Sequence, residues 1–281
     1  MLSLIELEQV AAQIRRDALR MVYLARSGHP GGALGCADLF AALYFNILNH
    51  QPVPFDMDGK DQDLFFLSNG HVCAAWYSAL ARSGYFPVSE LSTFRMLDSR
   101  LQGHPATCEG LPGIRVASGS LGQGLSVAIG SALAKKRNSD PHLVYCLLGD
   151  GELQEGQVWE AAMFAHARMI DNIIAIVDYN GQQIDGPVET VLSLGNLKNK
   201  WEAFGWTVLE TAGNNMSMLL QHLNEAKCLA FKKKPVVVVM HTIMGKGVDF
   251  MENDHRWHGS PPNDEQFERA ISQLPETLSD F

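Results

Sequence analysis

The chain has 281 residues, of which 46% are hydrophobic and 19% charged; this composition is typical of a folded globular protein and excludes an intrinsically disordered one. The formal net charge is -9 and no run of basic residues is longer than three, as at residues 232–234, which argues against nucleic acid as the main partner. No apolar run reaches the length of a membrane span, the five cysteines include no C-x-x-C pair, and Glu6 and Glu8 stand where a secretory signal is basic, so we expect a cytoplasmic protein without membrane association.

The N-terminal segment predicts two helices joined by a glycine-rich loop. Ser3 and Glu6 have the spacing of a capping box, and apolar residues follow at helical spacing until Gly28. Residues 28–35 contain four glycines and are expected to form a loop. A second helix is expected over about residues 37–47.

The next segment predicts one short strand and a long loop. Residues 64–67 are apolar and read as a strand that ends in Ser68-Asn69-Gly70-His71. Helices are expected to begin near Val72 and at Ser89, with Ser89 as an N-cap. Residues 100–119 show little periodicity, and a loop of that length in a compact domain is usually functional.

Apolar strands and helices alternate through the rest of the chain. The strands are expected over residues 143–148, 173–177, 207–209 and 236–240. The helices are expected over residues 120–136, 157–167, 197–204, 216–231 and 265–274. Strands this uniformly apolar are covered on both faces. The predicted fold class is therefore α/β, a doubly wound and mostly parallel sheet with helices on both faces, in a single domain over residues 1–281.

Two polar motifs follow neighbouring strands of this predicted sheet. Gly149-Asp150-Gly151 comes directly after the strand expected over residues 143–148, and Asn180-Gly181-Gln182 comes after the strand expected over residues 173–177. Ligands in such sheets bind beyond the carboxyl ends of the strands. The Asp150 carboxylate, the Asn180 amide oxygen and the main-chain carbonyl of Gln182 are hard oxygen ligands suited to Mg²⁺ with a phosphate group. Each motif alone is more often a turn, but the two together predict a metal-bridged diphosphate site.

Two glutamates follow this motif closely. Glu152 lies beside the predicted phosphate site. Glu155 begins a helix, where a carboxylate stabilises the helix dipole, and that role alone explains its presence. The functional alternative is that Glu155 takes part in a hydrogen-bond relay between the active sites of two subunits.

Four histidines share a setting that the other six lack. His29, His71, His104 and His258 are flanked by glycine or proline in loops. A single loop histidine is usually structural, whereas four beside a cofactor loop favour proton transfer and binding of sugar hydroxyls. The glycines of residues 118–124 also allow close approach to a ligand. Lys246 lies in Gly245-Lys246-Gly247, but the full phosphate-loop spacing is missing, which excludes an ATPase of that type.

These residues resemble the thiamine diphosphate enzymes, and transketolases in particular. The general signature runs from Gly149-Asp150-Gly151 to Asn180. The segments that resemble transketolases specifically are, in chain order, residues 27–32, 67–71, 103–105, 119–124, 245–247 and 257–259. The similarity covers nearly the whole chain in the order that transketolases have.

The resemblance implies thiamine diphosphate and a divalent cation, Mg²⁺ or another such as Ca²⁺ or Mn²⁺, as cofactors. It implies that the cation is bound by Asp150, Asn180 and Gln182. It implies cofactor contacts from His71, Gly119, Ser120, Leu121, Gly149, Asp150, Gly151, Glu152, Asn180, Lys246 and His258. It implies catalytic roles for His29, His71, His104, His258 and Glu155, and it places Asp178 near the cofactor or the subunit interface.

The chain differs from an ordinary transketolase in its length. Transketolases have three domains, and the motifs of the second and third do not appear after Gly259. The resemblance therefore implies the N-terminal subunit of a split transketolase, which transfers a two-carbon ketol unit between sugars. Its expected partner is a separately encoded C-terminal subunit, in a heterotetramer of two plus two.

Three other functions share part of the pattern. The alpha subunit of a 2-oxo-acid dehydrogenase has the Asp150 and Asn180 motifs but not the glycine-histidine motifs around His29, His71 and His104. A deoxyxylulose-phosphate synthase carries all three domains on one chain. A non-catalytic relative that keeps the fold would be expected to lose the metal ligands or the histidines.

Overall fold

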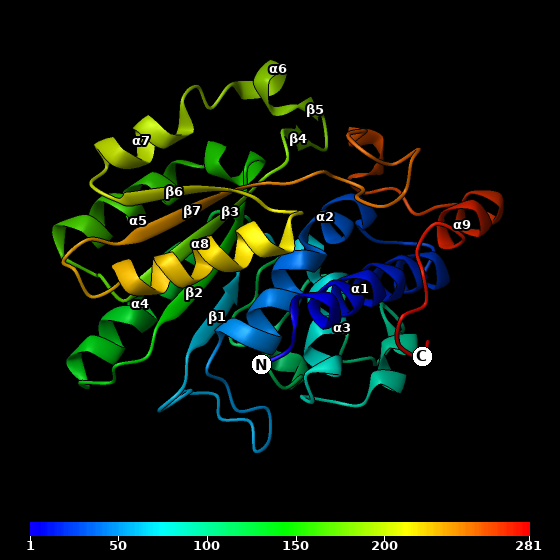
Figure 1. Cartoon of the computed structure of the whole chain (residues 1–281), viewed down its shortest axis with the longest axis horizontal. Coiled ribbons are helices and arrows are strands. Elements are labelled where there is room, and N and C mark those ends of the chain that lie inside the picture. The colour runs from blue at the N-terminus through cyan, green and yellow to red at the C-terminus, as the bar shows by residue number, and fades with distance from the viewer.

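The computed structural model describes all 281 residues and shows a five-stranded sheet with helices on both of its faces (Figure 1). The strand order is β1-β2-β3-β7-β6, and each neighbouring pair is parallel. The strands are β1 (Leu64–Leu67), β2 (Val144–Gly149), β3 (Ile173–Tyr179), β6 (Thr207–Ala212) and β7 (Val236–His241). The predicted fold class is therefore confirmed.

The helices divide between the two faces of the sheet. They are α1 (Leu4–Leu24), α2 (Pro30–Ala42), α3 (Cys73–Arg82), α4 (Gly124–Arg137), α5 (Gly156–Ala167), α6 (Val188–Leu192), α7 (Leu197–Ala203), α8 (Met216–Leu229) and α9 (Asp264–Ile271). On β3, Ile174 and Ile176 pack into a core with α1, α2, α3 and α8, whereas Ile173 and Ala175 pack into a second core with α4, α5 and α7. Burial on both faces explains why β1, β2, β3 and β7 are largely apolar, whereas the edge strand β6 is only partly buried and contains Thr and Glu.

The N-terminal helix begins as predicted, but the glycine loop does not extend to residue 35. Ser3 and Glu6 form the capping box. Helix α2 begins already at Pro30, because proline is favoured at the first helical position. Its glycines allow close packing: a Cβ on Gly31 would lie 2.9 Å from the main-chain oxygen of Trp257, and one on Gly35 would lie 3.0 Å from that of Ile243. The prediction of a loop over residues 28–35 was wrong from Pro30 onward, because the glycines there allow close contact between segments.

A second correction concerns Ser89. Residues Val88–Thr93 form a 3-10 helix that follows Pro87, so Ser89 lies inside the turn and is not an N-cap. The only helical segment within residues 100–119 is the short 3-10 helix Thr107–Glu109, as expected for a loop. The two-residue strands β4 (Gln182–Gln183) and β5 (Gly186–Pro187) form a hairpin that was not predicted, because strands this short have no periodicity.

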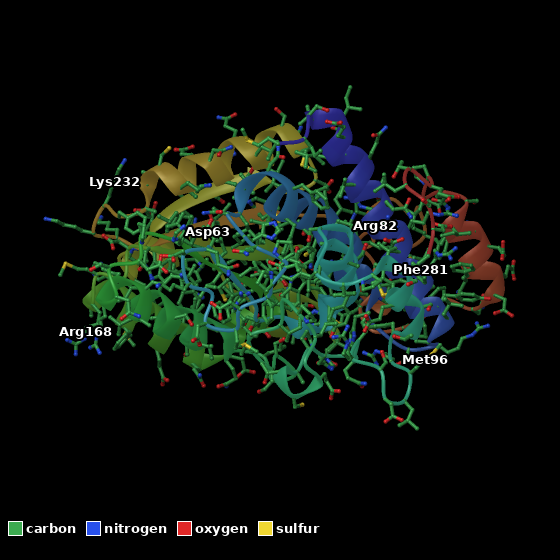
Figure 2. All side chains as sticks on the ribbon, turned by 90° about the horizontal axis from the view of Figure 1, so that it is seen from below. Asp63, Arg82, Met96, Arg168, Lys232 and Phe281 are labelled. Atoms are coloured by element: carbon green, nitrogen blue, oxygen red, sulfur yellow. The ribbon has the colours of Figure 1, made fainter.

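The two ends of the sheet lie far apart in the molecule. Arg168 and Lys232 mark the end where strands β3 and β7 begin, and Phe281 lies toward the opposite end (Figure 2). There the C-terminal segment packs on α1, where Asp280 accepts hydrogen bonds from Arg16 and Arg20. No helix combines the length and the apolar character required to cross a bilayer.

Candidate active site

The two motifs predicted to bind metal and phosphate meet at the carboxyl edge of the sheet. Gly149 and Asp178 are register partners at the ends of β2 and β3. A cavity of about 190 Å³ lies at this edge. The predicted site residues that line it are His71, Leu121, Gly149, Asp150, Gly151, Glu152, Glu155, Asn180, Gln182 and His258.

Asp150 is almost fully buried beside this cavity. Its Oδ1 accepts a hydrogen bond from the Gly151 main-chain N–H at 2.7 Å, and its Oδ2 accepts one from the Gly181 N–H at 2.6 Å. Burial, followed by the nearby charge of Asp178, raises the pKa of Asp150 to about 7. A carboxylate held this way is favoured when a cation binds next to it, because the cation offsets both effects.

Asp178 fixes the orientation of the Asn180 amide. The Asn180 Nδ2 donates to Asp178 Oδ2 at 2.9 Å, and its Oδ1 accepts a hydrogen bond from the Gln182 N–H at 2.9 Å, so the second lone pair of Oδ1 is what the amide can offer to a cation. The Thr242 hydroxyl and the Cys36 thiol also donate to the Asp178 carboxylate, which is fully buried. Burial raises the pKa of Asp178. The structure contains no cluster of three His, Cys, Asp or Glu side chains arranged for a metal, so a cation at this edge would also need amide or main-chain oxygens as ligands.

Glu152 connects three segments around the cavity. Its carboxylate accepts hydrogen bonds from the Gly122 N–H at 2.7 Å, the Gly149 N–H at 3.0 Å and the Ser68 hydroxyl. The Ser68 oxygen in turn accepts from the Gly124 N–H at 3.1 Å. Both Glu152 oxygens are therefore engaged by the protein, and Glu152 acts on the cavity through the loops that it holds.

The four predicted histidines come together from four different segments. The His29 ring centroid lies 5.3 Å from that of His71, 5.7 Å from that of His104 and 5.7 Å from that of His258. The His71 and His258 centroids are 4.8 Å apart. Burial lowers the pKa of all four, that of His29 to about 4. The imidazoles are therefore neutral at pH 7, and each can both donate and accept a hydrogen bond.

We expect His29 to make the chain less stable as the pH falls from about 6.5 to 4. Burial, and then His258, Arg95 and His104, lower its pKa in the folded state, whereas the unfolded chain takes up the proton near the ordinary value of 6.5. The contribution of the neutral His29 to the free energy of unfolding is therefore fully present above pH 6.5. It is lost as the pH falls toward 4, because the unfolded state binds more protons in this window. Urea unfolding of the unaltered chain and of His29→Asn at pH 7 and pH 5 measures this difference. The variant should lose less stability, and equal losses would contradict the prediction.

Arg95 joins two of the histidine loops and was not predicted from the sequence. Its Nη1 donates to the Ser27 hydroxyl at 2.7 Å, and its Nη2 donates to the Gly103 carbonyl at 3.3 Å. Ser27 and Gly103 precede the loop positions of His29 and His104. A Cβ on Gly103 would lie 2.4 Å from the Arg95 guanidinium carbon, so a side chain at this position would displace the guanidinium from its present place.

Three further predicted residues, Gly119, Ser120 and Lys246, do not line the cavity, whereas Glu155 does. A Cβ on Gly119 would have the His104 side chain as its nearest neighbour, at 3.7 Å, and Ser120 is exposed. The Lys246 ammonium pairs with Glu252 at 3.3 Å. Glu155 is part of the cavity lining and is the N-cap of α5, without a capping hydrogen bond. The roles of these four residues stay predictions.

Asn69 lines the same cavity and was absent from the predicted set. Leu67 of β1 pairs with Leu147 of β2, so Asn69, two residues later, lies at the same height along the sheet as Gly149, the last residue of β2. A polar residue at this place after a buried strand is the sequence signal that could have identified it.

Comparison with known proteins identifies a family that matches nearly the whole chain. A family profile described as "Transketolase, thiamine diphosphate binding domain" matches residues 7–275. An apulose-4-phosphate transketolase subunit of Phocaeicola vulgatus is 38% identical over 97% of this chain and 95% of its own length. A 6-deoxy-6-sulfo-D-fructose transketolase subunit of a Clostridium species is 38% identical over 96% of each chain.

A solved transketolase gives the same result for the fold. The crystal structure of transketolase from Campylobacter jejuni matches with a TM-score of 0.87 and 35% identity, over 96% of this chain but 43% of the other. The chain thus spans less than half the length of this transketolase, while it matches the subunits named above over almost all of theirs. It belongs to the transketolase family and corresponds to the thiamine diphosphate-binding domain of that family.

Proposed function

We propose that this chain is the metal- and thiamine diphosphate-binding subunit of a two-subunit transketolase. The reaction is transfer of a two-carbon ketol unit from a ketose, as its phosphate or a related sugar, to an aldose. The observation that carries the proposal is the match over nearly the whole chain to relatives named as transketolase subunits, together with four neutral histidines beside the cavity.

The residues around the cavity fit a diphosphate only together with a cation. Asp150, Glu152, Glu155 and Asp178 line the cavity, and no lysine or arginine does. An anionic diphosphate placed among these carboxylates needs a divalent ion to offset the repulsion. In our proposal the Asp150 carboxylate, the Asn180 amide oxygen and the Gln182 carbonyl hold this ion, Mg²⁺ or a similar divalent cation.

The chain's own groups then prepare the site for sugar substrates. Thiamine diphosphate, when bound, supplies the electron sink for breaking and forming the carbon–carbon bond next to the sugar carbonyl. His71 and His258 lie at the cavity, and His29 and His104 extend the same cluster away from it. Because these imidazoles are neutral, they can bind sugar hydroxyls and move protons at neutral pH.

The partner in this proposal supplies the rest of the centre. Two relatives that match over nearly their whole length are named as subunits of transketolases, and this chain spans less than half of a solved transketolase chain. We propose a separately encoded subunit with the pyrimidine-binding and C-terminal domains, in a heterotetramer. The relatives named for apulose-4-phosphate and 6-deoxy-6-sulfo-D-fructose make branched and sulfonated sugars candidate donors beside pentose phosphates.

The test is reconstitution of activity from two purified proteins. This chain alone is expected to give no ketol transfer, whereas its mixture with the candidate partner should transfer the two-carbon unit only when thiamine diphosphate and Mg²⁺ are added. A panel of ketose donors then identifies the substrate. Ketol transfer by the chain alone would contradict the split. Oxidative decarboxylation of a 2-oxo acid by the pair would favour the dehydrogenase alternative.

A further inference from the structure

Asn69 has a side-chain amide that is buried beside the cavity and has no partner within the chain. The residue is 1% exposed, and it begins the turn Gly70–Val72 after β1. Both its Nδ2 and its Oδ1 lack a hydrogen-bond partner. Buried amides are nearly always paired, so an amide with both ends free indicates a group that arrives from outside.

The unpaired amide contrasts with its surroundings. Ser68, the preceding residue, is bonded to Glu152 and to the Gly124 N–H. Two other side-chain amides at the cavity are engaged, since Asn180 Nδ2 donates to Asp178 and Gln183 Nε2 donates to Gln154 at 3.0 Å. Asn69 is therefore an uncommitted donor within a well-satisfied network.

The place of this amide relates it to the proposed diphosphate site. A Cβ on Gly149 would lie 3.7 Å from Asn69 Nδ2, so the amide borders the residue that precedes Asp150. Both residues line the same cavity. The Asn69 amide thus follows the end of β1, just as Asp150, the proposed metal ligand, follows the end of β2.

We propose that Asn69 is a positioning residue for the cofactor's diphosphate. Its Nδ2 donates a hydrogen bond to a phosphate oxygen, and its Oδ1 accepts one from a water molecule on the metal ion. Mg²⁺ in proteins usually keeps several waters, which makes such a donor available. This inference rests on the proposed function for the identity of the ligand. In the chain without ligand, the unpaired amide lowers stability, because its polar atoms are buried without compensation.

The experiment compares the full chain with Asn69→Leu and Asn69→Asp. The ligand is inorganic pyrophosphate with Mg²⁺, because its binding requires neither the thiazolium ring nor the partner. Calorimetry measures this binding, and thermal unfolding measures the melting temperature of each variant. Asn69→Leu has nearly the same shape without polar atoms, so it should raise the melting temperature without ligand and weaken pyrophosphate binding at least tenfold. Asn69→Asp offers only acceptors to the phosphate and should weaken binding further.

Asn172 provides a matched control at the other end of the sheet. It is fully buried just before β3, its Nδ2 donates to the Ala132 carbonyl at 2.9 Å, and its Oδ1 is unpaired. This end is marked by Arg168 and Lys232 in Figure 2. Asn172→Leu should lower the melting temperature and leave pyrophosphate binding unchanged.

The outcomes separate this inference from the proposed function. Unchanged pyrophosphate binding in Asn69→Leu, or a lower melting temperature without ligand, would overturn the role of Asn69 alone. Failure of the unaltered chain, with and without its partner, to bind pyrophosphate and Mg²⁺ would overturn both. If Asn69→Leu does not fold, Asn69→Ala gives the same comparison without added apolar bulk.

Discussion

Replacement of Asp150 by asparagine is expected to reduce magnesium-linked binding of thiamine diphosphate by at least about 100-fold, which corresponds to roughly 3 kcal/mol. In our proposal Asp150 supplies the carboxylate that binds the metal, and its two oxygens are oriented by the Gly151 and Gly181 N–H groups. An amide keeps the shape but removes the negative charge that attracts Mg²⁺. Calorimetry on the chain with its partner, with Mg²⁺ present and absent, measures the loss.

Asp178 gives a graded comparison for the same site. It orients the Asn180 amide and in our proposal does not itself bind the metal. Loss of such an orienting group typically weakens metal binding about 10- to 100-fold, so Asp178→Asn should lie between the unaltered chain and Asp150→Asn. Asp185→Asn removes one exposed carboxylate on the neighbouring hairpin and should have little effect. Binding by Asp150→Asn within threefold of the unaltered chain would refute the metal assignment.

The parts of this structure that were predictable from the sequence are those whose signal is local. Strands β1, β2, β3 and β7 are largely apolar because both of their faces are buried, and the motifs of Asp150 and Asn180 follow the carboxyl ends of β2 and β3. Parallel strands bring such ends to one edge whatever the details of packing. The metal and phosphate residues could therefore be placed together from their positions after the strands.

Contacts between distant segments gave no such signal. Positions 31 and 35 of α2 are occupied by glycine because main-chain oxygens of Trp257 and Ile243 approach them closely, and residues 28–35 alone do not reveal these neighbours. The Arg95 bridge from Ser27 to Gly103 joins segments whose proximity depends on the whole fold. In such cases tertiary packing decides between a flexible glycine loop and a tight contact, and local preference does not.

The free amide of Asn69 illustrates a further limit. Its residue type was visible in the sequence, but its importance lies in the absence of any partner for its two polar atoms. Satisfaction of a buried group is a property of all its neighbours at once, and it depends on the complete three-dimensional structure. The same holds for Glu152, whose partners come from three separate segments.

Removal of the Glu152 carboxylate is expected to give the largest loss of stability at this site. Glu152→Ala leaves the Gly122 and Gly149 N–H groups and the Ser68 hydroxyl unpaired in a buried place. Each unsatisfied group costs about 1–3 kcal/mol. For the three groups together we expect the free energy of unfolding to fall by about 3–5 kcal/mol. Urea unfolding at pH 7 measures it.

A second variant tests whether the hydrogen bonds cause this loss. In Glu152→Gln the amide oxygen can keep the Gly122 and Ser68 bonds, while the amide nitrogen faces the Gly149 N–H, so the loss should be about 1–3 kcal/mol. Glu160 is exposed on α5, and Glu160→Gln should change stability by less than about 0.5 kcal/mol. Because Glu152 holds residues 118–124 to the end of β2, its removal should also speed amide hydrogen exchange at Gly122 and Gly124 more than in the sheet. If Glu152→Ala is as stable as the unaltered chain, the three bonds to Glu152 do not hold the loop, and the shape of the cavity depends on other contacts.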